Sequence, residues 1–364
     1  MYSDIVPVKF KKLRVLHAPT DAVDQPMVIA KALRELGIEA DSLQYYRTSP
    51  ARYNATINVC IGNWSSPLGR LKSQLNAFIS VYKKYDIYHF HFGRSLLPFF
   101  LDLPVLKLSG KKIVFEYHGS DMRNPFKFVN PFSLPRKTGL LIKQGLVKFV
   151  SKLFVDAEIV TTPDMLEFAP RARYIPAAID SAWITASRGS NPGDKKRKKI
   201  VVIHAPSSQV IKGTKYVISA IAELKKEGFP VDLDLVEKVS PDKLRVRVAA
   251  ADIAIDQLLI GWYGLFAAEA MMLGKPVICY IRSDLRKYMP ELPIVSAGPE
   301  NLADVLKKTI KDYNLQEKLS IAGPIFARKH HESRAVAKKF LDIYKSLYSH
   351  RSLSDKTINE FEKV

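Results

Sequence analysis

The stretch GWYGLFAAEAMMLGKPVICYI (Gly261–Ile281) holds a loop, a helix and a strand in that order. Two glycines open it, and the apolar segment LFAAEAMML follows at helix length. Gly274 is placed as the C-terminal cap of this helix, and Pro276 prevents its continuation before the strand VICYI. With the apolar run ADIAID (251–256) ahead of it, the stretch predicts a strand–loop–helix–strand unit of a parallel sheet.

The same alternation extends outward over the chain. Predicted strands cover 14–18, 38–46, 86–92, 111–119, 157–163, 200–205 and 231–237. Predicted helices cover 27–37, 67–85, 139–155 and 214–228. The pattern restarts after a Pro/Gly/Ser-rich and then basic segment, 174–199, which is typical of a linker.

Two α/β domains of the doubly wound, Rossmann-like kind are therefore expected. The first spans 1–178 and the second 179–332, with a C-terminal helix at 333–348 predicted to pack back on the first domain. A polar tail, 349–364, ends the chain.

The composition indicates which partners and which compartment to expect. The 364 residues carry a net charge of +20, which favours a polyanionic partner such as phosphate or anionic lipid. The basic residues do not follow a known nucleic-acid recognition pattern, so no nucleic-acid partner is expected. Cys60 and Cys279 lie in apolar runs, as buried reduced thiols would, and no signal peptide or membrane-spanning stretch is seen. We expect a cytoplasmic protein.

Histidines mark the ends of predicted strands. His17, His91, His118 and His204 all lie at or near such ends. Ligands of open parallel sheets bind at the carboxyl ends of the strands, so these groups are expected to converge on one cleft.

Two patterns resemble metal sites. His89 and His91 share a strand face and could join His118, but no nearby carboxylate pattern completes a site. Asp232 and Asp234 form a DxD sequence inside an alternating strand, where a structural role is favoured. No metal site is expected.

Three residues of the second half are candidates for binding a nucleotide. Gly264 lies at a loop-to-helix junction, where backbone N–H groups and the helix dipole favour an anion. Glu269 is the one charged residue on an apolar helix, and ribose hydroxyls would give a buried carboxylate its partners. Lys212 precedes Gly213 and a helix start, a place suited to a diphosphate. The alternatives are a Glu on a solvated part of the helix and a surface Lys.

Taken together, these segments resemble the retaining GT-B glycosyltransferases of the large family-4-like group, also called glycosyl transferases group 1. The first half contributes DIYHFHF, EYHGSDMR and EIVTTPDMLEFAPRARYIPAAID. The second half contributes the IKG around Lys212 and the motif GxYGLxxxEAMxxGKPVI. The resemblance covers nearly the whole chain and implies two Rossmann-like domains facing across a cleft.

The resemblance implies a hexosyltransferase-type enzyme that takes a nucleotide-diphosphate sugar and retains anomeric configuration, without a cofactor or essential metal. On the donor side it implies Glu269 for the ribose hydroxyls, Lys212 for the diphosphate, and the backbone of Gly264, Leu265 and Phe266 against sugar and phosphate. From the first domain His118 would reach the transferred sugar. Asp121, His17 and His91 are expected along the acceptor side of the cleft.

The sequence departs from the family pattern at two donor-binding positions. Gly261 stands where the family has the first Glu of its pair, eight residues before Glu269. Ser207 stands where the family has an Arg, five residues before Lys212. The N-terminal Gly-rich loop is absent from 18–26, and the second domain omits one strand–helix unit.

The segment 122–155 contains no Asp or Glu, and its Lys and Arg residues alternate with Phe. Within 139–155, Gln144, Lys148, Ser151 and Lys152 cluster on one side of the predicted helix. Such a helix either lies on an anionic bilayer or packs in the core with a solvated basic face. We favour a peripheral position on the inner membrane face and a glycan or lipid-linked acceptor.

Three functions stay open at this point. The first is a glycosyltransferase of surface polysaccharide or glycolipid synthesis. The second is a nucleotide-sugar epimerase of the same architecture, which would need no acceptor. The third is a non-catalytic subunit that keeps the fold, which the residues at Gly261 and Ser207 would explain.

Overall fold

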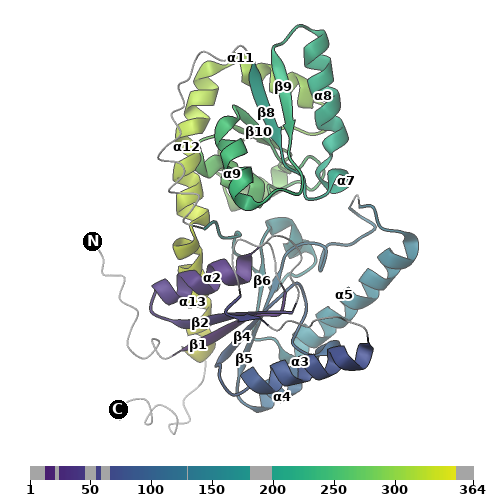
Figure 1. The fold of residues 1–364 in the computed structure, drawn as a ribbon, viewed down its shortest axis with the longest axis vertical. Helices are drawn as coiled ribbons and strands as arrows, with labels where there is room; N and C mark the ends of the chain where they lie inside the picture. Colours follow the sequence, from purple (N-terminus) through teal and green to yellow (C-terminus); the bar gives the residue numbers. More distant parts are fainter. Residues whose placement is uncertain are drawn as a thin grey trace.

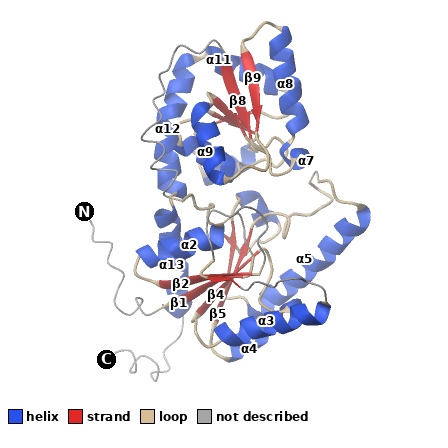
Figure 2. Cartoon of the chain, in the orientation of Figure 1, coloured by secondary structure: helices blue, strands red, loops and turns tan. Residues whose placement is uncertain are grey.

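The computed structural model describes residues 13–20, 24–45, 55–58, 66–128, 130–180 and 199–349. Two α/β domains stand one above the other, each a sheet covered by helices (Figures 1 and 2). Cys60, most of the predicted linker and the tail after Ser349 lie outside the described residues.

The first domain is built on a parallel sheet of seven strands in the order β3-β2-β1-β4-β5-β6-β7. The strands are β1 (Arg14–Ala18), β2 (Glu39–Gln44), β3 (Ile57–Asn58), β4 (Ile87–His91), β5 (Lys112–Tyr117), β6 (Ala157–Val160) and β7 (Arg173–Tyr174). The helices are α2 (Gln25–Glu35), α3 (Pro67–Val81), α4 (Asp102–Leu108) and α5 (Leu134–Phe154), with 3-10 turns η1 (Pro98–Phe100) and η2 (Pro163–Glu167).

The two faces of this sheet differ in what covers them. Side chains alternate along a strand, so Tyr88 and Phe115 point to one face, where they pack with residues of α3, α4 and α5. Ile87 and Val114 point to the other face, where they pack with residues of α2 and α13 (Ser333–Ser349).

The second domain is built on a parallel sheet of five strands in the order β12-β11-β10-β8-β9. These are β8 (Ile200–His204), β9 (Val231–Leu235), β10 (Ile253–Ile255), β11 (Val277–Cys279) and β12 (Ile294–Ser296). The helices are α7 (Gln209–Lys212), α8 (Thr214–Lys226), α9 (Pro241–Ala250), α10 (Leu265–Met272), α11 (Leu302–Lys311) and α12 (Tyr313–His331), with the 3-10 turn η3 (Ser283–Tyr288). Helices α9, α10 and α12 share one core cluster, and α8 and α11 share another.

The end of the chain returns to the first domain. Helix α12 belongs to the second domain, and α13 follows it and packs against α2 (Figure 1). At the crossing, His331 Nδ1 lies 2.8 Å from Ala177 O and His331 Nε2 lies 2.8 Å from Tyr263 O–H. Tyr344 of α13 is fully buried in the first domain's core.

The predicted α/β class with two doubly wound domains is confirmed. Predicted strands and helices coincide with observed ones to within a few residues, and β9 leads directly into α9 and β10. The strands β3, β7 and β12 and the helices α4, α7, α11 and α12 were not predicted. The strands, α4 and α7 have seven residues or fewer, which give too little periodicity.

Candidate active site

A pocket lies between the two domains. From the first domain it is lined by side chains of the 120–140 segment, among them Ser120, Arg123 and Phe132. From the second domain it is lined by Ile211 and by residues 259 and 260. Both sequence segments singled out for function, around His118 and around Lys212, therefore border the same pocket.

Lys212, Asp256 and Gly264 converge at the start of α10. Lys212 Nζ lies 2.8 Å from Asp256 Oδ1, and the Gly264 N–H donates to Asp256 Oδ2 over 2.6 Å. A methyl group on Gly264 would lie 2.9 Å from Lys212 Nζ, so the ammonium packs directly on the backbone that begins the helix. The first N–H groups of a helix have no intrahelical partner, so a cation and open donors face the same spot.

Local sequence explains this placement. Gly213 adopts φ +79°, a left-handed conformation that ends α7 and begins α8, and so turns Lys212 inward. The Leu258 N–H donates to the Lys212 carbonyl over 3.1 Å, which ties the α7 turn to the loop after β10. Asp256 directly follows β10, at the carboxyl end where ligands of such sheets bind.

The other predicted donor residues lie close along α10. Glu269 is buried on a helix whose residues from Phe266 to Met272 are all buried. Gly264 is the N-cap, Leu265 begins the helix half-buried, and Phe266 is buried behind it. Ser207 is exposed in the loop between β8 and α7.

The space beside Gly261 is occupied by another residue. Gly261 has φ +91°, and a Cβ there would lie 2.6 Å from both Cγ and Cδ of Arg282. The Arg282 guanidinium pairs with Glu167 of the first domain at 2.6 Å and with Asp284 at 2.7 Å. The aliphatic part of Arg282 therefore fills the space beside Gly261, where the family has its first Glu. The guanidinium of the same residue links the second domain to the first.

His118 and Asp121 form a tight turn at the end of β5. Both carboxylate oxygens of Asp121 accept from the His118 N–H, at 3.1 and 3.2 Å, and Oδ1 also accepts from the Gly119 N–H at 2.7 Å. The His118 side chain is 8% exposed and stacks on Phe92. Burial raises the pKa of Asp121 and lowers the pKa of His118.

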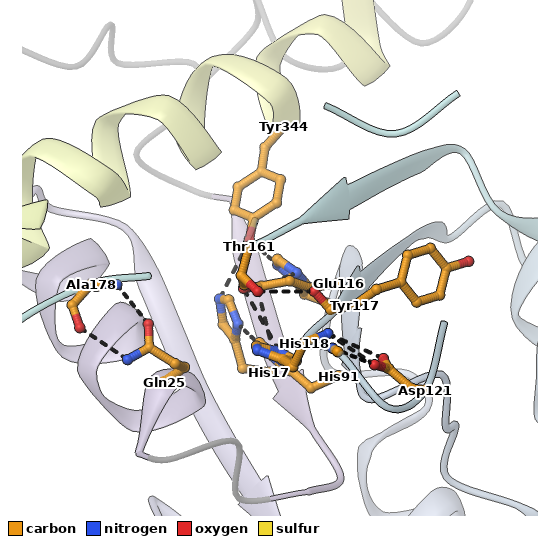
Figure 3. A network of polar contacts seen from close by, with 12 residues as sticks. His17, Gln25, His91, Glu116, Tyr117, His118, Asp121, Thr161, Ala178 and Tyr344 are labelled. Atoms are coloured by element: carbon orange, nitrogen blue, oxygen red, sulfur yellow. Dashed lines mark hydrogen bonds and ion pairs between the residues drawn. The ribbon is translucent and has the colours of Figure 1, made fainter. Parts of the chain in front are cut away.

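His17 and His91, expected along the cleft, lie one layer beneath it. Both are fully buried. His17 Nδ1 lies 3.0 Å from His91 Nε2, and His91 Nδ1 lies 3.0 Å from His118 Nε2 (Figure 3). Burial lowers the pKa of both His17 and His91 well below the usual value and raises the pKa of Glu116, beside them, to about 7.

Sequence reasoning missed three charged residues at these sites: Asp256, Arg282 and Glu116. Asp256 carried a usable signal, because an acidic residue follows an apolar strand at its carboxyl end. Glu116 lies within β5, where the pattern indicated only a strand residue. Arg282 meets Gly261 through a long-range fold contact that no sequence spacing reports.

The DxD sequence has the predicted structural role in β9. Asp232 pairs with Lys225 and Lys199, and Asp234 pairs with Arg247. Cys279 is buried, as expected.

The sequence assigned the polar side of α5 incorrectly. Gln144 and Ser151 were grouped with the lysines, but both are buried, and Gln144 Nε2 donates to the carbonyls of Ser120 and Arg123. Lys148 and Lys152 are exposed as expected, and the outward face also carries apolar side chains, including Ile142 at 70% and Phe149 at 61% exposure. Among the described residues, no helix combines the length and apolarity needed to cross a bilayer.

The chain matches no family model and no curated protein. Its structure is similar to sucrose-phosphate synthase from Thermosynechococcus elongatus, with 15% identity over 93% of this chain and 99% of that one, TM-score 0.63. The catalytic domain of starch synthase IV from Arabidopsis thaliana, bound to ADP and acarbose, has 12% identity over 93% and 100%, TM-score 0.61. Anabaena HepE in complex with UDP-glucose has 11% identity over 92% and 100%, TM-score 0.58. These likenesses concern the fold, and they confirm the predicted GT-B arrangement of two Rossmann-like domains.

Proposed function

We propose that this protein is a glycosyltransferase that moves a sugar from a nucleotide-diphosphate donor to an acceptor hydroxyl. The observation that carries the proposal is the convergence of Lys212, Asp256 and Gly264 at the start of α10. Ile211, directly before Lys212, lines the pocket from the second domain, and Ser120, in the turn after His118, lines it from the first. Solved structures of the same fold hold UDP-glucose and ADP, which supports a nucleotide ligand here.

Each group has a role in this chemistry. The diphosphate leaves with negative charge, which the Lys212 ammonium and the N-terminus of α10 stabilise. Asp256 holds Lys212 against the helix start, so the cation is positioned before the donor arrives. We assign Glu269 to binding of the ribose hydroxyls and the His118–Asp121 turn to contact with the transferred sugar. Retention follows if the departing phosphate oxygen accepts the acceptor's proton on the same face of the sugar.

The acceptor side favours a membrane. Of the twenty-two exposed large hydrophobic side chains among the described residues, fifteen lie between Leu68 and Leu153. They come mainly from α3, α4 and α5, and the segments 67–85 and 122–155 contain basic residues and no Asp or Glu. An apolar surface bordered by cations matches an anionic bilayer, worth about 1 kcal/mol per basic residue near the surface. We therefore propose peripheral binding and a lipid-linked acceptor for a surface glycan or glycolipid.

The donor test is isothermal titration with UDP-, GDP- and ADP-sugars, first on the wild type and then on variants. Lys212→Ala and Glu269→Ala should each weaken binding of the accepted donor about tenfold or more, as expected for losing a charged contact. His118→Ala should lower turnover more than binding. Lys215→Ala is the matched control, because Lys215 is exposed on α8 and three residues from Lys212.

The alternatives give different results. If the donor is consumed and a second nucleotide sugar accumulates without any acceptor, the protein is an epimerase. If a donor binds but no acceptor is glycosylated, the protein is a non-catalytic subunit. Unchanged donor binding in both the Lys212 and Glu269 variants contradicts the site itself. NMR of the product's anomeric signal decides retention.

The membrane test is co-sedimentation with vesicles of anionic and of neutral lipid. Lys143/Lys148/Lys152→Glu should abolish binding to anionic vesicles, and Ile142→Asn with Phe149→Asn should weaken it. The control is Ile321→Asn with Ile325→Asn, which are 61% and 63% exposed on α12 of the second domain. Equal binding by wild type and the lysine variant contradicts peripheral attachment and leaves the donor site unaffected.

A further inference from the structure

One face of the first sheet carries a buried cluster of imidazoles around one carboxylate. The strand register sets it: His17 of β1 lies opposite His89 of β4, and His91 lies opposite Glu116 of β5. Because side chains alternate, these residues and His118 all belong to the sheet face that α13 covers (Figure 3). Three neighbouring strands therefore bring metal-ligating side chains to one place.

Three of these side chains have the spacing of a metal site. His91 Nδ1 lies 3.0 Å from His118 Nε2 and 3.4 Å from Glu116 Oε2, and His118 Nε2 lies 3.7 Å from Glu116 Oε1. Metal bonds of about 2.1 Å at tetrahedral or octahedral angles separate neighbouring ligand atoms by roughly 3.0–3.4 Å. The three separations therefore lie within or near the range of a metal site.

The cluster also contains buried atoms without hydrogen bonds. Glu116 Oε2 and His89 Nε2 are both buried and neither makes one, although they lie 3.1 Å apart. A buried carboxylate oxygen without a donor is costly. A cation bound to the carboxylate supplies the missing partner.

The remaining contacts form an outer chain that fixes the ring orientations. His91 Nε2 lies 3.0 Å from His17 Nδ1, His17 Nε2 lies 3.3 Å from the Tyr344 hydroxyl, and that hydroxyl lies 2.6 Å from His89 Nδ1. With His91, His17 and His89 each protonated on Nε2, every link has one donor and one acceptor, and the chain ends with His89 Nε2 facing Glu116. The Nδ1 lone pair of His91 is then directed to the ligand set. Such outer partners are typical of ligating histidines.

We propose that His91 Nδ1, His118 Nε2 and the Glu116 carboxylate bind a divalent transition-metal ion, with Zn²⁺ as the reference. Two imidazoles and a carboxylate suit Zn²⁺ and related ions, whereas Ca²⁺ and Mg²⁺ prefer oxygen ligands throughout. Three protein ligands leave a coordination position open. His118, the partly exposed member, lies at the pocket side of the set.

The site would tie β4, β5 and the His118–Asp121 turn to α13 through Tyr344. The ligand set lies within the first domain and shares only His118 with the proposed transfer site, so Zn²⁺ uptake tests the metal site separately from sugar transfer. The sequence-based expectation of no metal site considered the imidazoles without their carboxylate, which the fold brings beside them.

The test uses tag-free full-length protein, stripped with a chelator and titrated with Zn²⁺ alone. The expected result is one equivalent of Zn²⁺ by calorimetry and by elemental analysis, and visible d–d absorption when Co²⁺ is bound instead. Glu116→Gln and His91→Ala should lose the equivalent. Tyr344→Phe, which removes an outer hydroxyl and no ligand, should weaken Zn²⁺ binding about tenfold.

The matched control is His330→Gln. His330 also faces a carboxylate, Glu291 at 3.0 Å, but on the surface of α12 and apart from the cluster, so its loss should change nothing. Circular dichroism checks that each variant is folded. If one of the ligand variants is unfolded, His118→Asn is tested in its place. The proposal is overturned if the folded wild type takes up no Zn²⁺, or if folded ligand variants retain a full equivalent. Donor titrations on the same samples separate this outcome from failure of the proposed function.

Discussion

Gly261→Ala should destabilise the second domain well beyond the cost of its backbone strain. Gly261 has φ +91°, and a left-handed conformation costs a non-glycine residue about 1–2 kcal/mol. The new Cβ would also lie 2.6 Å from two carbons of Arg282. Overpacking of this kind costs about 1–3 kcal/mol, so the expected total is about 2–5 kcal/mol.

Movement of Arg282 relieves the collision only in part, because the atoms met, Cγ and Cδ, lie near the backbone end of its side chain. Displacing the stem separates its guanidinium from Glu167 and Asp284, at 2.6 and 2.7 Å, although these exposed pairs contribute about 0–1 kcal/mol each. In an Arg282→Ala background the collision disappears and only the backbone strain remains. The two substitutions should therefore couple by about 1–3 kcal/mol in a double-mutant cycle.

Gly228→Ala separates the two contributions. Gly228 has φ +82°, and a Cβ added there would have nothing within 4 Å, so this substitution reports the backbone strain alone. The assay is urea unfolding followed by the fluorescence of buried Trp262, in a background where Trp64 and Trp183 are Phe. If Gly261→Ala costs no more than Gly228→Ala, or costs the same with and without Arg282, the steric argument is refuted.

Three further predictions concern single sites. Asp256→Ala leaves the Lys212 ammonium without its buried partner, so chemical denaturation should show a loss of about 3–5 kcal/mol that adding Lys212→Met largely restores. Gly264→Ala should displace Lys212 and weaken donor binding about tenfold in calorimetry, because the new Cβ would lie 2.9 Å from Lys212 Nζ, whereas φ −101° by itself suits alanine. Burial lowers the pKa of His331 from 6.5 to about 4, so its neutral form adds stability above pH 6.5 that is lost as pH falls toward 4. His331→Gln should flatten that part of the unfolding-versus-pH curve, which spans about 3 kcal/mol; an unchanged slope would contradict the assignment.

Much of the fold could be predicted because most core strands are apolar runs and the helices predicted at 27–37, 67–85, 139–155 and 214–228 have a clear period. Lys212 and Gly264 could be identified because strand ends and helix starts are local features. Helix α5 shows a feature that the local sequence cannot predict, namely which side of a helix faces solvent. Periodicity indicates which residues share a face, but not which face is outward. Gln144 is buried because two backbone carbonyls accept its amide, and that requires the fold.

The site around Lys212 in the second domain and the site around His118 in the first have the same arrangement of a polar group and a buried carboxylate. In each domain a group that can face a ligand, Lys212 or His118, lies at the carboxyl end of the sheet. Behind it stands a buried carboxylate, Asp256 at 2.8 Å from the lysine Nζ and Glu116 at 3.7 Å from the imidazole Nε2. His118 follows β5 and Lys212 ends the short helix α7 beside a helix start, so both stand out in a sequence, whereas Glu116 lies inside β5 and is indistinguishable there from a structural residue. Because a buried carboxylate needs a cation or donors, its position fixes the group before it. In each domain a pair of residues therefore acts together, and in the first domain the sequence alone singles out His118 but not Glu116.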